Sequence, residues 1–257
     1  EDIDFLFDYI NSGDPARRAW CIENIREKEM LANFDSRTGG HNAWWPARDY
    51  LPQVNGVNAA VLMAHAFNDW NVMPEHSVRI VEALKARGVP VQVYYHQGGH
   101  GGEPPLAMMN RWFTRYLYDV QNGVENDPRA WIVRERAARN EPTPYADYPN
   151  PVASPVTLYL EAGAPGVGGL AMDRPARQGT ETLVDNVSFS GAALAQAEWT
   201  NHRLIYATPE LTDSLHLSGT ARITIRVAAS KAAANLSVWL DELPFTERPN
   251  QPTSVIT

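Results

Sequence analysis

The feature that most constrains the fold of this chain is a regular alternation of strand-like and helix-like segments in its first half. It begins with a continuous apolar run, AAVLMAHA (59–66), which is typical of a strand buried in a parallel sheet. A helical pattern that ends at a glycine follows in MPEHSVRIVEALKARG (73–88). A second strand, VPVQVYYH (89–96), and a second helix, PPLAMMNRWFTRYLYDV (104–120), complete the alternation. This order predicts a sheet with helices packed on its faces.

The segment before this alternation is helical. Its apolar residues predict one helix from Asp2 to Ile10 and a second helix that begins near Pro15 and runs to about Leu31. A turn-rich aromatic loop then leads to the first strand. We therefore assign residues 1–36 to a helical segment.

The segment after Gly123 has an all-β pattern. It contains short β-branched segments, several with period-two alternation, separated by Pro, Gly and Asn turns. We expect strands in RAWIVRE, VTLYLEA, TETLVDNVSFSG, RLIYATPEL, ARITIRVAAS and LSVWLDELPF. This pattern is typical of a β-sandwich or jelly roll. The sequence as a whole therefore predicts an α/β plus all-β fold. Its expected domains are the helical segment 1–36, an α/β part at 37–124 and a β-sandwich at 125–257.

Composition narrows the class of protein. Of the 257 residues, 44% are apolar and 20% are charged, which suits a globular chain with a normal core. The formal net charge of −8, without a basic block, argues against nucleic acid or an anionic membrane as the main partner. No apolar run reaches the ~18 residues of a membrane span. We expect a soluble protein, either cytoplasmic or secreted.

The single cysteine, Cys21, excludes an intrachain disulfide and a cysteine-based zinc cage. No two histidines have the spacing of a metal site, so no metal or organic cofactor is expected. The chain begins at Glu1 rather than at a methionine. We therefore expect a processed or truncated piece of a longer protein.

Two polar groups follow the predicted strands at the point where functional groups collect in α/β sheets. Asp69 lies just after the first strand, and His100 lies among four glycines just after the second. Neighbouring parallel strands would bring the two loops side by side. An aspartate that orients a histidine is two thirds of a nucleophile–base–acid triad. The sequence therefore predicts an acid–base pair made by Asp69 and His100.

The nucleophile of such a triad is not found in this chain. No G-x-S-x-G elbow occurs, and neither Ser12 nor Ser36 follows a predicted strand. Ser77 lies inside the predicted helix after Asp69, and the later serines belong to the all-β part. We therefore expect the chain alone to be inactive.

Two longer stretches carry a family resemblance. The segment AAVLMAHAFNDWNVMPEHSVRIVEALKARGVPVQVYYHQGGHGG, with the preceding NAWWPARDYLPQV, resembles the second half of the catalytic domain of X-prolyl dipeptidyl aminopeptidases. These serine peptidases belong to the α/β-hydrolase family that also holds the cocaine esterases. The segment LSGTARITIRVAASKAAANLSVWLDEL is similar to the carboxy-terminal jelly roll of the same family.

The resemblance implies roles for particular residues. Asp69 would be the triad acid and His100 the base, with the serine in a segment before Glu1. Residues 1–36 would belong to a helical cap, and the jelly roll would be truncated. The implied substrate is a proline-containing peptide, from which an X-Pro dipeptide is released. The implied partner is the missing amino-terminal part of the same enzyme. Whether the protein forms a homo-oligomer stays open.

Several alternatives remain open from the sequence. Trp44 and Trp45 could line a substrate pocket as flat apolar walls for a proline ring, or could simply pack their loop onto the core. His65 and His96 end buried strands and are interpreted as hydrogen-bonded structural residues. The alternative activity is an ester or acyl hydrolase of the same family. A non-catalytic binding module is the alternative from another class.

Overall fold

The computed structural model describes residues 13–33, 40–69, 71–163, 165–176, 179–232 and 234–245. The chain divides into two compact units. The first holds the described residues of Glu1–Val54 and Ile223–Val238, and the second holds those of Asn55–Arg222 and Trp239–Thr257. The two units are described separately below.

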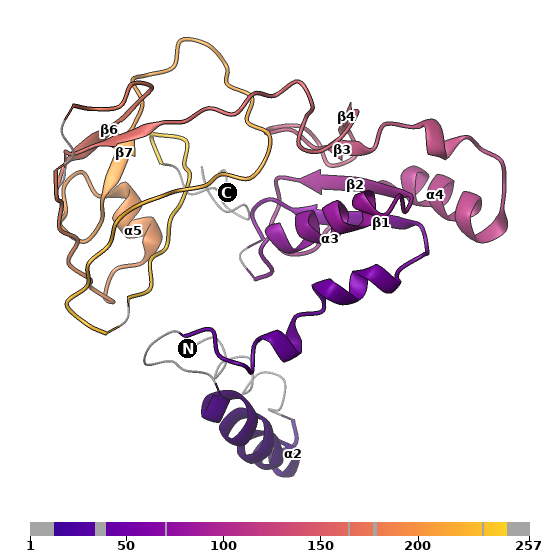
Figure 1. Ribbon diagram of the computed structural model, residues 1–257, viewed down its shortest axis with the longest axis horizontal. Coiled ribbons are helices and arrows are strands. Elements are labelled where there is room, and N and C mark those ends of the chain that lie inside the picture. The colour runs from indigo at the N-terminus through magenta and orange to yellow at the C-terminus, as the bar shows by residue number, and fades with distance from the viewer. Residues whose placement is uncertain are drawn as a thin grey trace. The chain divides into compact units, whose positions relative to one another are not determined.

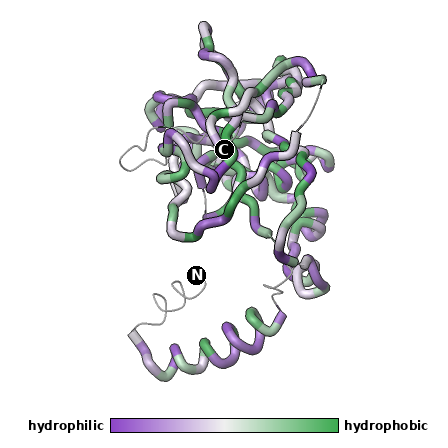
Figure 2. Tube along the Cα trace, turned by 90° about the vertical axis from the view of Figure 1, so that its left-hand side faces the viewer, coloured by the Kyte–Doolittle hydropathy of each residue, from purple (hydrophilic) through white to green (hydrophobic). Residues whose placement is uncertain are grey.

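The first unit contains the predicted second helix. It begins as α2 (Pro15–Cys21), where the Asp14 carboxylate accepts hydrogen bonds from two backbone N–H groups of the first turn. It continues as the π-helix η1 (Ile22–Leu31), which confirms a helix up to Leu31. Hydrophilic and hydrophobic residues alternate along it (Figure 2). The helix predicted over Asp2 to Ile10 lies outside the described residues.

Short 3-10 helices connect this helix to the second unit. They are η2 (Pro46–Arg48) and η3 (Leu51–Gly56). They lie in and just after the WWPARDYLPQV stretch (44–54), where two prolines disfavour longer regular structure. The loop with short structure that the sequence predicts here is confirmed.

The second unit is built on a four-stranded sheet in the order β1-β2-β3-β4. Its first three strands are parallel, namely β1 (Val61–Ala66), β2 (Val91–His96) and β3 (Ala130–Ile132). The fourth strand, β4 (Thr143–Tyr145), is antiparallel to β3. The parallel register sets Ala66 beside His96, so β1 and β2 end at the same edge of the sheet.

The helices between these strands are α3 (Glu75–Ala86) and α4 (Leu106–Tyr118), as the sequence predicts to within two residues at each end. Helix α3 packs against β1 and β2, as Figure 1 shows. Its Val81 and Leu84 are almost completely buried. All six residues of β2 are buried, which is expected for a strand in the interior of a parallel sheet. This packing gives the strand ends a rigid support.

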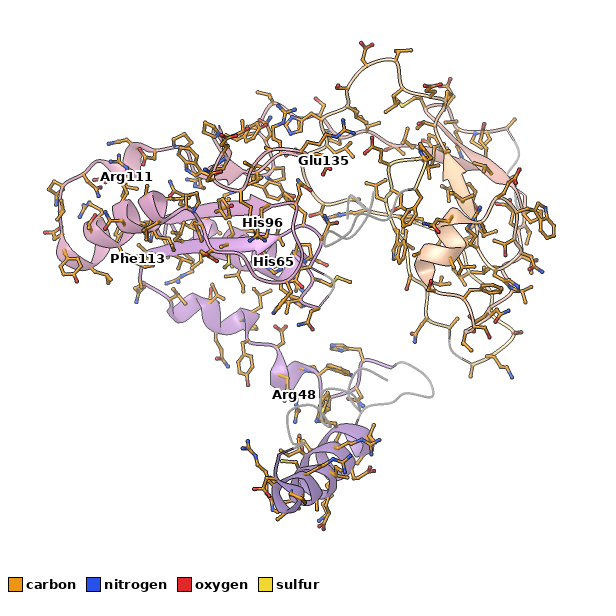
Figure 3. The ribbon with its side chains drawn as sticks, turned by 180° about the vertical axis from the view of Figure 1, so that it is seen from behind. Arg48, His65, His96, Arg111, Phe113 and Glu135 are labelled. Carbon is orange, nitrogen blue, oxygen red and sulfur yellow. The ribbon has the colours of Figure 1, made fainter. Side chains whose placement is uncertain are left out.

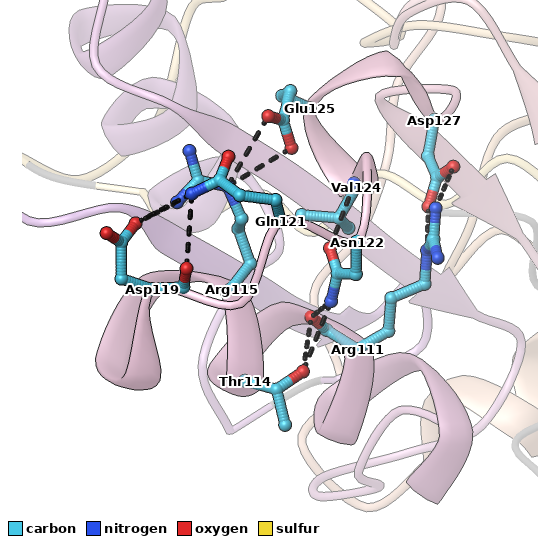
Figure 4. Close-up of polar contacts among 9 residues, drawn as sticks. All are labelled: Arg111, Thr114, Arg115, Asp119, Gln121, Asn122, Val124, Glu125 and Asp127. Atoms are coloured by element: carbon cyan, nitrogen blue, oxygen red, sulfur yellow. Dashed lines mark hydrogen bonds and ion pairs between the residues drawn. The ribbon is translucent and has the colours of Figure 1, made fainter.

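A polar network fixes the connection from α4 to β3. Arg111 makes two hydrogen bonds to the Asp127 carboxylate, of 2.7 and 3.0 Å (Figure 4). The Asn122 side chain donates to the backbone carbonyl of Arg111, while Arg115 contacts Asp119 and Glu125. The short 3-10 helix η4 (Val124–Asn126) lies within this network. The network holds the chain where it turns back into the sheet.

The first sheet crosses the boundary predicted near residue 125. The segment RAWIVRE was assigned to the all-β part, but its centre forms β3 and pairs with β2. Ala130 and Ile132 are buried in this sheet. A short apolar segment has the same pattern in either kind of sheet, so only its pairing partner distinguishes the two.

The remaining strands form a separate three-stranded sheet. Its members are β5 (Tyr159–Glu161), β6 (Val167–Ala171) and β7 (Ile205–Ala207), in that order. Strand β6 pairs antiparallel with β5 and parallel with β7. The short helix α5 (Gly191–Gln196) begins at Ser190, whose hydroxyl accepts from the Ala193 N–H. The chain therefore combines an α/β part with a carboxy-terminal region that contains β structure.

Several other segments predicted as strands in the carboxy-terminal region have no strand over the residues that the structure describes. The segments TETLVDNVSFSG, ARITIRVAAS and LSVWLDELPF contain no strand over their described residues, apart from a single bridge residue at Asp241. A period-two pattern specifies a strand only where a partner strand takes up its backbone hydrogen bonds. The complete jelly roll therefore stays a prediction.

Candidate active site

Asp69 lies in a tight turn that follows β1. Its side chain is almost completely buried. Carboxylate oxygen Oδ1 accepts hydrogen bonds from the backbone N–H groups of Asn71 (3.0 Å) and Val72 (2.9 Å). This arrangement is an Asx-type turn, in which the aspartate fixes its own loop. It leaves the second oxygen, Oδ2, available for another partner.

His100 lies in the glycine-rich loop that follows β2. Gly101 and Gly102 have φ values of +87° and +111°, which side chains rarely allow. The amide of Asn68 donates to the backbone carbonyl of Gln97 at 2.9 Å, which ties this loop to the loop after β1. The parallel pairing of β1 and β2 and this cross-link bring the two loops together.

The two predicted site residues are in contact. Nδ1 of His100 lies 2.9 Å from Oδ2 of Asp69. A carboxylate can only accept, so Nδ1 carries the proton of this bond and Nε2 of a neutral His100 is a proton acceptor. The His100 side chain is 62% exposed, whereas that of Asp69 is 5% exposed. A buried carboxylate therefore orients an imidazole that solvent or substrate can reach.

The environment keeps Asp69 ionised. Burial alone would raise its pKa, but the hydrogen bonds from the Val72 N–H, from His100 and from the Asn71 N–H outweigh burial. The net effect lowers the pKa of Asp69 below its ordinary value. An ionised carboxylate in contact with Nδ1 stabilises the imidazolium that forms when His100 takes up a proton.

A second imidazole, that of His65, also faces Asp69 and is hydrogen-bonded as the sequence interpretation expects. Nε2 of His65 lies 2.8 Å from the carbonyl oxygen of Val72 and 3.5 Å from Oδ2 of Asp69. Because a carbonyl only accepts, His65 donates from Nε2 and closes the turn that carries Asp69. In the sequence, the spacing of four residues between His65 and Asp69, across a strand end, was the signal that could have indicated that the two side chains are neighbours.

His96 is completely buried at the end of β2. Figure 3 shows it close to His65 on the neighbouring strand. Its Nδ1 accepts a hydrogen bond from the Gly98 N–H at 3.0 Å. Burial and, next, the positive charge of Arg139 lower the pKa of His96. His96 is therefore a neutral hydrogen-bonded residue under the His100 loop, which agrees with its interpretation as a structural histidine.

Trp44 and Trp45 belong to the first unit. Their rings meet edge to face with centroids 4.7 Å apart. The indole N–H of Trp44 donates to Glu29 at 3.1 Å, and the Arg48 guanidinium lies 3.8 Å above the Trp44 ring. Trp44 is therefore fixed by polar neighbours of its own unit. A role of Trp44 and Trp45 in binding substrate stays a prediction.

The described residues form neither a metal centre nor a membrane-spanning helix. Within the described residues, no group of three or more His, Cys, Asp and Glu side chains could hold a metal ion. None of the described helices is long and apolar enough to cross a membrane. A cavity of about 330 Å³ lies beside α5 and β7, lined by residues that include Val167, Arg203 and Phe245. It contains none of the residues of the Asp69–His100 pair.

Comparison with protein families places this chain in a known group. The family model described as X-Pro dipeptidyl-peptidase (S15 family) matches residues 9–102, which include Asp69 and His100. The model described as X-Pro dipeptidyl-peptidase C-terminal non-catalytic domain matches residues 122–257, more than half of the chain. The chain belongs to the X-Pro dipeptidyl-peptidase family.

Individual relatives agree with this family. A protein of Rhodopirellula baltica, provisionally named an Xaa-Pro dipeptidyl-peptidase, is 58% identical over 97% of this chain and 40% of its own length. A provisionally named Xaa-Pro dipeptidyl-peptidase of Bacillus anthracis is 31% identical over 83% of this chain and 36% of its own length. The Xaa-Pro dipeptidyl-peptidase of Lacticaseibacillus rhamnosus is 29% identical over 86% of this chain. The chain thus spans about 40% or less of the length of these relatives.

Proposed function

We propose that this chain supplies the acid and the base of a serine peptidase that releases X-Pro dipeptides from the amino termini of peptides. The observation that carries the proposal is the 2.9 Å contact between Nδ1 of His100 and Oδ2 of Asp69. This contact leaves Nε2 of an exposed imidazole as a general base. Membership of the X-Pro dipeptidyl-peptidase family supplies the substrate class.

In the proposed mechanism His100 acts as a base and then as an acid in each half of the reaction. Its Nε2 takes the proton of a serine hydroxyl as the serine oxygen attacks the carbonyl carbon of the proline, the second residue of the substrate. The imidazolium then gives the proton to the leaving amine. Asp69 holds the imidazole in the Nδ1–H tautomer and stabilises its charged form through both steps. Water then attacks the acyl-enzyme, with His100 again taking a proton as the base, and the imidazolium returns that proton to the serine oxygen as the X-Pro dipeptide is released.

The serine is proposed to come from a segment outside this chain. The sequence contains no G-x-S-x-G elbow. The matching relatives are about two and a half to three times as long as this chain. On this proposal the purified chain has no peptidase activity, because its base has no hydroxyl to activate. Cleavage of Ala-Pro-p-nitroanilide by the purified chain, at a rate near that of the full-length protein, would refute this part.

The substrate side of the site is also a proposal. Trp44 and Trp45 would provide flat apolar walls for the proline ring. The carboxy-terminal region would complete its jelly roll in the full-length protein. The proposed partners of the chain are thus a proline-containing peptide and the amino-terminal part of the same enzyme.

One experiment separates the peptidase from an esterase of the same family. We would measure kcat/KM of the full-length protein for an X-Pro anilide and for an aryl ester under the same conditions. The proposal expects the X-Pro anilide to be preferred over a Gly-Gly anilide and over the ester after correction for the uncatalysed rates. A preference for the ester, with no discrimination between the two anilides, would reassign the activity.

A further inference from the structure

The loop that carries His100 is wrapped around a buried imidazole. This loop, Gln97–Gly102, runs over His96, which has no exposed surface. Nδ1 of His96 accepts the Gly98 N–H at 3.0 Å. Nε2 of His96 is buried, and the backbone of Gly101 and Gly102 lies next to the ring. The shape of the loop is thus set by contacts with His96.

Two glycines allow this close approach. A Cβ atom added to Gly98 would lie 2.9 Å from Nδ1 of His96. A Cβ atom added to Gly102 would lie 2.6 Å from Nε2 of the same ring. Both distances are shorter than real Cβ contacts allow, and Gly102 also has a positive φ. His96 therefore fits between the two ends of the loop only because both are glycines.

Arg139 contacts the same two ends of the loop. Its Nη2 would lie 2.7 Å from a Cβ atom on Gly98 and 2.8 Å from one on Gly102. Its backbone is held in place by Tyr94 of β2, whose hydroxyl donates to the Arg139 carbonyl at 2.7 Å. The guanidinium thus lies against His96 and both ends of the His100 loop. It reaches this position from outside the β1–α4 segment.

We propose that Arg139 and His96 are positioning residues that hold the loop of His100 in its working shape. Arg139 lies within residues 122–257, the segment matched by the model of a C-terminal non-catalytic domain. The carboxy-terminal segment of the chain thereby contributes directly to the architecture of the site. This inference rests on the proposed function, because it gives the loop a role in catalysis.

The His100 loop needs Arg139 and His96 because a loop rich in glycine does not keep one conformation by itself. Glycine loses the most conformational freedom on ordering, and this loop has four glycines in six residues. The hydrogen bond to Nδ1 of His96 holds Gly98, and this bond needs His96 to be neutral. The charge of Arg139 opposes protonation of His96. The guanidinium also fills the space beside Gly98 and Gly102.

The test uses the full-length protein and three variants, with Ala-Pro-p-nitroanilide as substrate. Arg139→Gln should lower kcat about 10- to 100-fold with little change in KM, because a displacement of the base by about 1 Å can cost 100-fold. Arg139→Lys keeps the charge and should recover most of the activity. Arg134→Gln, an exposed arginine of the same segment, is the matched control and should behave as the wild type.

Hydrogen exchange measured by mass spectrometry gives a readout that does not depend on activity. Arg139→Gln should speed exchange in peptides that cover residues 94–102 and leave the peptides of α3 unchanged. An unchanged kcat, or a lower kcat without faster local exchange, would overturn the inference. Faster exchange throughout the protein, with Arg139→Lys no better than Arg139→Gln, would show a merely structural role and overturn it as well.

The same design separates this inference from the proposed function. If the wild-type full-length protein does not cleave X-Pro substrates, the proposed function fails and the exchange data alone decide the inference. Faster local exchange in Arg139→Gln would then support the positioning of the loop, and unchanged exchange would overturn it.

Discussion

The α/β sheet and the carboxy-terminal sheet of the second unit bury their apolar side chains to very different extents. Every residue of β2 is buried, and Leu84 of α3 is 1% exposed. In the carboxy-terminal region, Val152 is 85% exposed and Val187 is 92% exposed. No residue of β5 or β7 is buried. The α/β sheet therefore has a core of its own, and the carboxy-terminal region does not have a comparable one among its described residues.

This difference indicates why the candidate site lies where it does. A catalytic pair needs its side chains held by elements that do not move relative to each other. Asp69 and His100 follow two strands paired over six residues and backed by a helix. The strands of the carboxy-terminal sheet pair over three residues each. Arg139, which we propose to position the His100 loop, lies between β3 and β4 and so belongs to the α/β sheet rather than to the carboxy-terminal sheet.

The largest expected effect comes from removing the base. In the full-length protein, His100→Ala should lower kcat for Ala-Pro-p-nitroanilide by at least about 10⁴-fold, because loss of a triad member removes the proton acceptor. His202→Ala changes a histidine of the carboxy-terminal region and should leave kcat near the wild-type value. Equal losses of kcat in the two variants would contradict the claim that the α/β sheet carries the active site and the carboxy-terminal sheet does not.

The next effect concerns stability. Leu84→Ala should destabilise the chain by about 2–5 kcal/mol, because it leaves a cavity under the α/β sheet. Leu217→Ala, at a position 47% exposed in the carboxy-terminal region, should cost less than about 0.5 kcal/mol. Urea unfolding of both variants measures the difference. Similar costs would mean that the carboxy-terminal region is packed as tightly as the sheet.

A third prediction concerns the backbone of the His100 loop. Gly102→Ala should lower kcat about 100-fold in the full-length protein, because the new methyl group would lie 2.6 Å from Nε2 of His96 at a φ of +111°. Gly99→Ala is the matched control, since its Cβ atom would meet nothing closer than an Asn68 oxygen at 3.9 Å. If the Gly102→Ala variant were as active as Gly99→Ala, position 102 would not require glycine.

The smallest expected effect concerns the second imidazole at Asp69. His65→Leu should lower kcat about tenfold, because the Val72 carbonyl loses its donor and the turn of Asp69 loosens. His65→Gln keeps an N–H donor and should retain most of the activity. We would compare kcat and the thermal midpoint of both variants. If Gln were no better than Leu at an unchanged midpoint, the hydrogen bond to Val72 would have no part in activity.

The sequence predicted the α/β part well because that part is specified locally. Each strand and helix between residues 59 and 120 carries its own periodicity, and a right-handed parallel connection leaves few ways to assemble them. The contact of Asp69 with His100 follows from that assembly. His65 escaped notice as a neighbour of Asp69 because its bond to Val72 depends on how the turn folds back.

Other features depend on contacts that no local pattern encodes. The strand at Ala130–Ile132 has the same apolar character in either sheet, and only its pairing with β2 places it. Arg139 reaches the His100 loop from about 40 residues further along the chain. The period-two segments after residue 180 predicted strands, but over most of their described length they have no partner strand.

A double-mutant cycle on Asp69 and His100 tests the central claim most directly. In the full-length protein we would measure kcat for Ala-Pro-p-nitroanilide in Asp69→Asn, in His100→Ala and in the double variant. If the carboxylate acts only through the imidazole, the double variant should be about as slow as His100→Ala alone. If instead the two losses multiplied in the double variant, Asp69 and His100 would act independently and the acid–base pair would be contradicted.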